Sequence, residues 1–342
     1  MDISKLPTKD LQDRIWQFLR DIGVEDKTFD AKLISEMIYS SCRLYHDQHN
    51  TAQLKLINHS LREMRYAFKV FNQFPPEERR LSIFGSARTP EDHPDYMAAK
   101  DFSTQMSKHE WMCITGAAGG IMKAGHEGST QEAIFGLSID LTFESGANVH
   151  IEGDPKHINF KYFFTRKLMF LAHSDAIAIF PGGFGTMDEL FEVLTLIQTG
   201  KSGIVPLVLL EGAGGTYWDT WLQYVEANLI GNKTINAEDK NLFYQAPTVE
   251  DAVDHIQKFY SRYHSSRYVK DLFVIRMLSP LTSEQVESLN AQYSMIIKSG
   301  KIEQGTALPQ EDDALELPRL IFHFTGHNFA TLRQMIDQIN DY

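Results

Sequence analysis

The sequence contains a glycine-rich stretch, Pro181-Gly182-Gly183-Phe184-Gly185-Thr186-Met187-Asp188-Glu189. It follows an apolar run at residues 176–180 and precedes apolar residues at helical spacing over 190–197. This order predicts a strand, a glycine turn and a helix. Closely spaced glycines let the backbone bring its N–H groups to a ligand at a helix N-terminus, where an anion is favoured. The stretch therefore predicts a phosphate site, but one without the Gly-Lys-Ser/Thr of nucleoside-triphosphate hydrolases.

A structural alternative explains part of the same stretch. Thr186, followed three residues later by Glu189, matches a capping box, in which both side chains bond to backbone donors at the start of a helix. Capping does not require three glycines, which cost roughly 0.5–1 kcal/mol each in regular structure. The sequence therefore favours phosphate binding over capping alone.

Composition indicates an ordinary globular protein. Its 342 residues are 43% hydrophobic and 23% charged, a length that suits about two domains. The longest apolar runs, such as residues 204–210, are shorter than the roughly 18 residues of a membrane span, and residues 1–8 have no apolar signal region. Two cysteines favour a reducing cytoplasm over a disulfide framework or a zinc site. The net charge of −12 argues against a nucleic-acid partner held through many phosphates.

The chain divides into three predicted parts. Residues 1–76 read as three helices whose apolar residues pack in a core or an interface, and Pro75-Pro76 ends the third. Residues 264–342 read as a small α+β appendage of strand, helix, strand and helix. Its acidic run, Glu311-Asp312-Asp313 with Glu316, is typical of a solvated loop. We assign the N-terminal helices a covering or dimerisation role.

The central part, residues 77–263, alternates strands and helices. Strands are predicted at 81–84, 111–115, 137–141, 175–180 and 204–210. Helices are predicted near 95–109, 119–134, 160–173, 186–199 and 216–229. Asn159 is expected to cap the helix near 160–173. Such alternation predicts an α/β fold with a parallel sheet covered on both faces, which binds ligands at the carboxyl ends of its strands. Three glycine turns are expected there, at residues 85–88, 115–120 and 181–186.

An arginine precedes the last of these turns in a segment rich in aromatic residues, Phe163-Phe164-Thr165-Arg166-Lys167-Leu168-Met169. Its guanidinium either extends along the surface or fixes a buried anion. Together with residues 176–190, this segment strongly resembles the LONELY GUY (LOG) family of nucleoside 5′-monophosphate phosphoribohydrolases, also labelled lysine decarboxylases. The resemblance covers about residues 80–262, with further matches at 84–88, 115–122, 137–148 and 196–201.

The resemblance implies a Rossmann-like nucleotide-binding domain that hydrolyses the N-glycosidic bond of a nucleoside monophosphate. It implies that Arg166 and Glu189 are catalytic. Glu189 would stabilise the oxocarbenium character of the ribose and deprotonate water, while Arg166 would fix the substrate or bond to the departing base. The residues expected to bind the phosphate and close the nucleotide site are Gly85, Ser86, Gly119, Gly120, Gly182, Gly183, Gly185 and Thr186.

Other polar residues are assigned lesser roles. Arg88 is expected to reach a phosphate, Asp188 a ribose hydroxyl, and Lys167 solvent or a phosphate rather than a pyridoxal cofactor. The histidines at 126, 150, 157 and 173 lack metal-ligand spacing and are interpreted as surface or core residues. We expect neither a metal nor a cofactor.

The leading hypothesis is an AMP-preferring nucleosidase that releases free base and ribose 5-phosphate, and the resemblance implies a homodimer. The alternative is a nucleotide- or cofactor-binding carrier or sensor that keeps the fold without catalysis. Retention of both Arg166 and Glu189 favours the enzyme, because a phosphate binder needs only the glycine loop.

Overall fold

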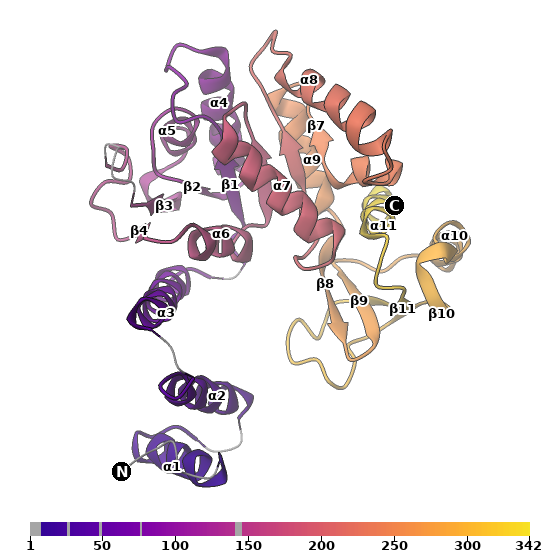
Figure 1. Ribbon diagram of the computed structural model, residues 1–342. Helices are drawn as coiled ribbons and strands as arrows, with labels where there is room; N and C mark the ends of the chain where they lie inside the picture. Colours follow the sequence, from indigo (N-terminus) through magenta and orange to yellow (C-terminus); the bar gives the residue numbers. More distant parts are fainter. Residues whose placement is uncertain (1–7, 26–27, 48–49, 76, 141–145) are drawn as a thin grey trace. The chain divides into compact units, whose positions relative to one another are not determined.

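The computed structural model describes residues 8–25, 28–47, 50–75, 77–140 and 146–342 (Figure 1). The predictions for residues 1–7, Pro76 and Leu141 lie outside these ranges. The chain forms two compact units, Met1–Arg65 and Tyr66–Tyr342. The predicted division at residues 76 and 263 stays a prediction. None of the described helices is long and apolar enough to cross a membrane.

The N-terminal segment forms the three predicted helices, α1 (Thr8–Asp21), α2 (Phe29–Leu44) and α3 (Thr51–Phe71). Leu11, Ile15 and Leu19 are buried and pack against residues that include Ile38 of α2. Apolar residues remain exposed on the same two helices, with Phe18 at 52%. The covering or dimerisation role of these helices stays a prediction.

A seven-stranded parallel sheet forms the centre of the second unit. The strands are β1 (Arg80–Phe84), β2 (Met112–Thr115), β3 (Ile134–Ile139), β4 (His157–Phe160), β5 (Ala176–Ile179), β6 (Leu207–Leu209) and β7 (Tyr244–Gln245), in the order β4-β3-β2-β1-β5-β6-β7. The order reverses at β1, since the chain runs outward to β4 and then returns to β5. The carboxyl ends of β1 and β5 therefore form the switch point at which such sheets bind ligands.

Helices cover both faces of this sheet, as predicted. They are α4 (Pro94–Lys108), α5 (Ile121–Glu127), α6 (Phe163–Ala172), α7 (Phe184–Gln198), α8 (Tyr217–Tyr224), continued by the π-helix η3 (Val225–Ile230), and α9 (Val249–Phe259), with short 3₁₀-helices at Gln131–Ala133 and Ala237–Leu242. Leu81 and Ile83 of β1 belong to one core with residues of α4, α5 and α9. Ser82 and Phe84 contact the opposite layer, through Ser174, which follows α6, and Phe170 of α6. The alternation of β1 thus places α6 on the second face.

Two predicted helices are wrong in their bounds. Asn159 does not cap a helix: it lies in β4, which the sequence analysis missed, and α6 begins at Phe163 after Tyr162 without a side-chain cap. The helix predicted over 119–134 ends at Glu127, because Ile134 already begins β3. In both places the pairing of β3 with β4 overrides the local pattern.

The C-terminal region contains an antiparallel sheet in the order β10-β11-β9-β8. Its elements are β8 (Tyr263–Val269), β9 (Leu272–Met277), α10 (Ser283–Gln292), a 3₁₀-helix (Ser294–Ile296), β10 (Ile297–Gly305), β11 (Arg319–Phe324) and α11 (Phe329–Asp341). The sequence analysis found the two inner strands and missed β8 and β10. Both are edge strands and largely polar, so they lack the apolar run that marks a buried strand.

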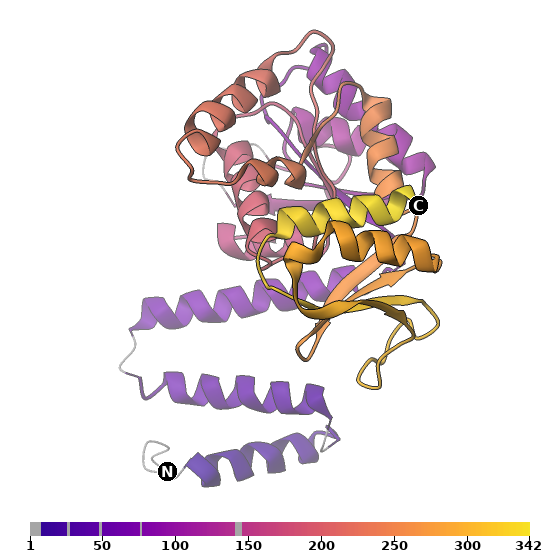
Figure 2. The ribbon, with the colours of Figure 1, turned by 90° about the vertical axis from the view of Figure 1, so that its right-hand side faces the viewer.

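Helix α11 joins this region to the central sheet. It lies beside α10, where Tyr293 Oη donates to Gln338 Oε1 over 2.8 Å (Figure 2). Asn340 Oδ1 accepts from the backbone N–H groups of Arg262 and Tyr263, and Asn340 Nδ2 donates to the carbonyl of Phe259 at the end of α9. These bonds make the C-terminal helix part of the second unit.

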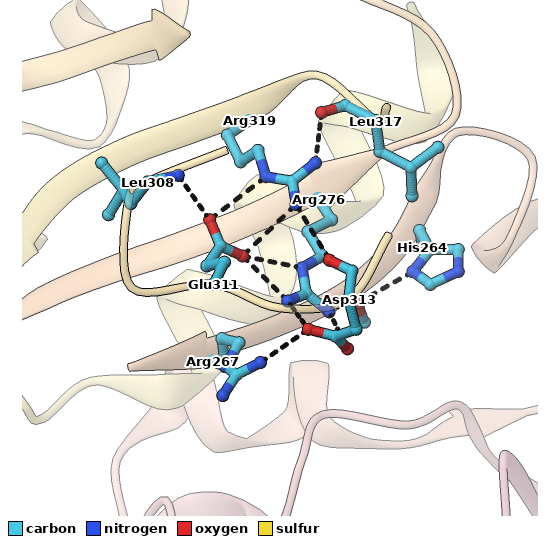
Figure 3. Close-up of polar contacts among 9 residues, drawn as sticks. His264, Arg267, Arg276, Leu308, Glu311, Asp313, Leu317 and Arg319 are labelled. Carbon is cyan, nitrogen blue, oxygen red and sulfur yellow. Dashed lines mark hydrogen bonds and ion pairs between the residues drawn. The ribbon is translucent and has the colours of Figure 1, made fainter. Parts of the chain in front are cut away.

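The acidic run is not the solvated loop that the sequence predicts. Glu311 is buried, and its carboxylate accepts from Arg276 and Arg319, which lie opposite each other on β9 and β11 (Figure 3). Asp313 also pairs with Arg276, while Asp312 is exposed. Burial alone would raise the pKa of Glu311, but the Leu308 N–H and the two guanidiniums outweigh it, and the net pKa is lowered. The loop is therefore held to the sheet by a buried ion cluster.

We predict that Glu311→Ala destabilises the protein by about 3–5 kcal/mol, because it leaves two buried guanidiniums without this partner. Thermal and denaturant unfolding measure this loss, and Asp312→Ala is the matched control, expected to change stability by less than about 0.5 kcal/mol. Because the folded-state pKa of Glu311 is lowered, its contribution is present at neutral pH and is lost as the pH falls through that pKa. Equal stability of the two variants would contradict the cluster's role.

Candidate functional site

A cavity of about 670 Å³ opens at the carboxyl ends of the central strands. This volume lies in the range of small-molecule sites. Its walls come from the loops after β1, β2 and β5, the ends of β3 and β4, and the first turns of α6 and α7. The cavity therefore lies at the switch point that the strand order defines.

The phosphate loop of the sequence analysis forms one wall. Helix α7 begins at Phe184, with Gly183 as its N-cap and without a side-chain cap bond. Thr186 and Glu189 consequently lie inside the helix, and the capping-box alternative is wrong. The first N–H groups of a helix have no intrahelical acceptors, and the helix dipole favours an anion beside them. Gly183, Phe184 and Gly185 line the cavity at this end, so the geometry suits a phosphate.

Two glycines are required by close packing at the switch point. A Cβ on Gly182 would lie 2.1 Å from Thr186 Oγ1 and 3.0 Å from the backbone nitrogen of Ser86. A Cβ on Gly120, whose φ is +57°, would lie 2.2 Å from the carbonyl oxygen of Ser86. The loops after β1, β2 and β5 are thus packed backbone to backbone, which holds their cavity-facing residues together.

Arg166 points into the cavity from α6. Its Nε donates to the carbonyl of Leu137 over 2.7 Å, and its guanidinium carbon lies 5.3 Å from the centre of the Phe170 ring. A Cβ on Gly116 would lie 2.4 Å from Arg166 Nη2, so the guanidinium rests on the loop after β2. The guanidinium is therefore held at the cavity wall and not extended along the surface, while its role in fixing an anion stays a prediction.

Glu189 lines the same cavity from α7 and is only 8% exposed. Burial raises the pKa of its carboxyl to about 7, the positive charges of Lys167 and Arg166 oppose this rise, and Glu192 and Asp188 add to it. A carboxyl with a pKa near neutrality exchanges a proton readily at physiological pH. Arg166 and Glu189 thus bring a cation and a proton-exchanging carboxylate to one cavity.

Lys167 does not line the cavity, contrary to its predicted place facing solvent or a phosphate. Its ammonium is 2.8 Å from Asp188 Oδ2 and 2.6 Å from Glu192 Oε2, and the residue is buried. Burial alone would lower the pKa of Lys167, but the two carboxylates outweigh it and raise the pKa. The lysine is therefore a protonated link between α6 and α7, which positions Arg166 relative to Glu189.

The structure brings most of the other predicted site residues together. Gly85, Ser86, Arg88, Gly183, Gly185, Thr186 and Asp188 line the cavity, while Gly119, Gly120 and Gly182 lie behind its wall. Among the described residues, no group of three or more His, Cys, Asp or Glu side chains is arranged to hold a metal ion.

A buried histidine supports the loop after β2, which the sequence analysis did not foresee. His126 Nε2 donates to the carbonyl of Phe135 over 3.0 Å and contacts Thr115 Oγ1 at 2.9 Å, so its Nδ1 accepts from Asn148 Nδ2. Burial lowers the pKa of His126 to about 4, which keeps it neutral. Asn148 also donates to the carbonyl of Ala117, a non-glycine residue at φ +65°. The network holds this unusual backbone in the cavity wall.

Ser138, His157 and Asn159 are further cavity residues that sequence reasoning missed. His157 is interpreted from sequence as a surface or core histidine, and Asn159 as a helix cap. The alternation of residues 157–160, in which Ile158 and Phe160 are buried, is the signal that would have identified β4.

Comparison with known proteins agrees with the sequence resemblance. Residues 117–256 match a family described as "Possible lysine decarboxylase". Over 101 residues the chain is 33% identical to cytokinin riboside 5′-monophosphate phosphoribohydrolase LOG4 of Arabidopsis thaliana, a match that covers 30% of this chain and 45% of the relative. A probable enzyme of the same name from Oryza sativa subsp. japonica, LOGL3, is 31% identical over 99 residues, or 29% and 44% of the two chains. The chain thus spans less than half the length of these relatives.

Among solved structures, the molybdenum cofactor carrier protein of Chlamydomonas reinhardtii aligns with 53% of this chain and 98% of its own at 18% identity and a TM-score of 0.38. The resemblance to the LOG proteins is confirmed at the level of the domain. Residues 117–256 thus resemble the family described as "Possible lysine decarboxylase", and part of the chain resembles the LOG enzymes.

Proposed function

We propose that this protein hydrolyses the N-glycosidic bond of a nucleoside 5′-monophosphate, AMP foremost, to free base and ribose 5-phosphate. The observation that carries the proposal is the buried Glu189, with a pKa of about 7, in one cavity with Arg166 and the uncapped N-terminus of α7. The curated relatives are named for the same type of bond cleavage on cytokinin riboside 5′-monophosphates.

The reaction assigns one task to each group. The 5′-phosphate binds at the N-terminus of α7 and the adjoining Ser86, which holds the ribose beside Glu189. Ionised Glu189 takes a proton from water, whose oxygen attacks C1′ as the C1′–N bond breaks. The electron pair of that bond leaves with the base, whose nitrogen takes up a proton from solvent while Glu189 releases the proton that it took from the attacking water. Arg166 stabilises the negative charge that grows on the base during this step.

We predict that Glu189→Gln lowers base release by roughly a hundred- to ten-thousand-fold, the usual contribution of a general base. Chromatography of AMP, GMP, CMP, UMP and IMP reactions measures the free base. Calorimetry with ribose 5-phosphate is expected to give nearly unchanged binding, because the amide that replaces the carboxyl group has the same size and shape. Glu287→Gln is the control, since Glu287 is an exposed glutamate of α10 that does not line the cavity.

Nucleotide binding without base release from any of the five nucleotides would refute the enzyme and favour the alternative, a non-catalytic carrier or sensor. Loss of activity in both glutamate variants would instead show that the effect is not specific to Glu189.

We predict that kcat/KM rises with pH and levels off above about pH 7, because Glu189 must be ionised and its pKa is raised to about 7. Below that pH the rate is expected to fall about tenfold per unit. Glu192→Gln removes a negative charge that raises this pKa, so its profile should move to lower pH. The affinity for ribose 5-phosphate, measured over the same range, corrects for ionisation of the phosphate itself. A rate independent of pH between 5 and 8 would contradict the role of Glu189.

We further propose that the protein acts as a homodimer through the apolar surface beside the cavity mouth. Phe163, Phe164 and Leu168 of α6 are 50–53% exposed, and Phe184 at the start of α7 is 97% exposed. Exposed aromatic and aliphatic side chains gathered on neighbouring elements are typical of an interface.

We predict that Leu168→Glu converts a dimer into monomers, because it places a charge in this apolar surface. Sedimentation velocity measures the change, and Lys108→Glu, at an exposed end of α4, is the control expected to leave the dimer intact. A wild-type protein that is monomeric at high concentration would contradict the proposed dimer.

A further inference from the structure

The cavity extends beyond the reacting groups to the carboxyl ends of β3 and β4. Ser138 near the end of β3 and both Asn159 and the first residue, His157, of the four-residue β4 line this part of the cavity, whereas the proposed phosphate site lies at β1 and β5. Strands lie about 4.8 Å apart, so β4 is about 14 Å from β1 along the sheet. An extended nucleotide with a hydrogen bond at each end spans such a distance. Arg166 lies between these ends, since it contacts the loop after β2 and the carbonyl of Leu137 on β3.

Hydrogen bonds among Ser138, His157 and Asn159 determine which atom of each side chain donates and which accepts. Ser138 Oγ donates to Asn159 Oδ1 over 3.2 Å, and His157 Nε2 lies 2.8 Å from the same hydroxyl. Because the serine has one proton and gives it to Asn159, the histidine N–H is the donor to Ser138. The amide oxygen of Asn159 is thereby fixed toward Ser138, with a second lone pair remaining. The side chain of Asn159 is exposed in the cavity.

An amide held in this way has one acceptor and one donor side by side. This pair matches the exocyclic N6 amino group and the N7 acceptor of adenine, which asparagine binds through two hydrogen bonds. Hypoxanthine and guanine have two acceptors at the same positions, O6 and N7. Their O6 would face the oxygen of Asn159, and the serine bond prevents the amide from rotating to accommodate it.

This inference rests on the proposed nucleoside-monophosphate substrate and specifies its base. We propose that Asn159 reads the edge of the base and selects adenine over 6-oxopurines, and that Ser138 and His157 are positioning residues which fix the orientation of its amide.

The test compares AMP with IMP, which differ at the 6-position of the base. The ratio of their kcat/KM values is expected to be roughly tenfold or more in the natural protein, the discrimination that one bidentate pair supplies. Asn159→Leu and Ser138→Ala should bring this ratio to within about threefold of unity, because the first removes the amide and the second lets it rotate. Inhibition by ribose 5-phosphate, which has no base, should stay unchanged in both variants, and this excludes a general loss of structure.

Asp140 lines the same end of the cavity and offers a carboxylate to an amino group, so Asp140→Asn is the decisive comparison. Loss of the AMP preference in that variant, with its retention in Asn159→Leu, would overturn the proposal. A natural protein that does not distinguish AMP from IMP would also overturn it.

The preference is measured a second time as the ratio of dissociation constants for AMP and IMP, by calorimetry on Glu189→Gln and its double variants with Asn159→Leu and Ser138→Ala. The binding ratio tests Asn159 whether or not base is released. Failure of hydrolysis alone therefore refutes the proposed reaction. A binding ratio that does not depend on Asn159 refutes the proposal that Asn159 selects adenine.

Discussion

The site depends on the close approach of three loops where the strand order reverses. The loops after β1 and β5 meet at Ser86 and Gly182 without room for a Cβ, and Gly120 packs on the carbonyl of Ser86. This contact aims the open N-terminus of α7 at the cavity and places Glu189 one turn further along the same helix. Because the uncapped N-terminus and the carboxylate belong to one helix, the distance between them is set by helix geometry.

The electrostatics of the site follow from that arrangement. Glu189 is buried at a helix start whose dipole favours anions, yet its pKa is raised because desolvation outweighs the nearby cations. Lys167 forms ion pairs with Asp188 and Glu192, and these pairs hold α6 to α7. Arg166 is bonded to a backbone carbonyl and keeps its charge beside the cavity. Glu189 can therefore gain or lose a proton near neutral pH, while Arg166 stays positively charged.

The C-terminal region shows how a second sheet is tied to the first. Helix α11 contacts α9 through Asn340, and Phe329 packs against Gly200, which follows α7. The buried cluster of Glu311 with Arg276 and Arg319 attaches the loop that contains Glu311 to the antiparallel sheet. Three buried charges are tolerated because each guanidinium bonds to a carboxylate and the carboxylate also accepts a backbone N–H. The C-terminal region therefore packs against the end of α7, the helix that begins at the glycine loop.

The α/β class and the strand before each glycine turn follow from the sequence, because apolar period and glycine spacing are local properties, whereas the pairing of Arg166 with Glu189 was implied by the family resemblance. The sequence also determined three N-terminal helices. Tertiary contacts, in contrast, bury Glu189 instead of leaving it to cap a helix, pair Lys167 with carboxylates, and place Asn159 in a strand at the cavity. The edge strands β8 and β10 and the burial of Glu311 likewise depend on tertiary contacts. Each of these features arises from partners distant in the chain, and a local pattern contains no information about desolvation or strand pairing.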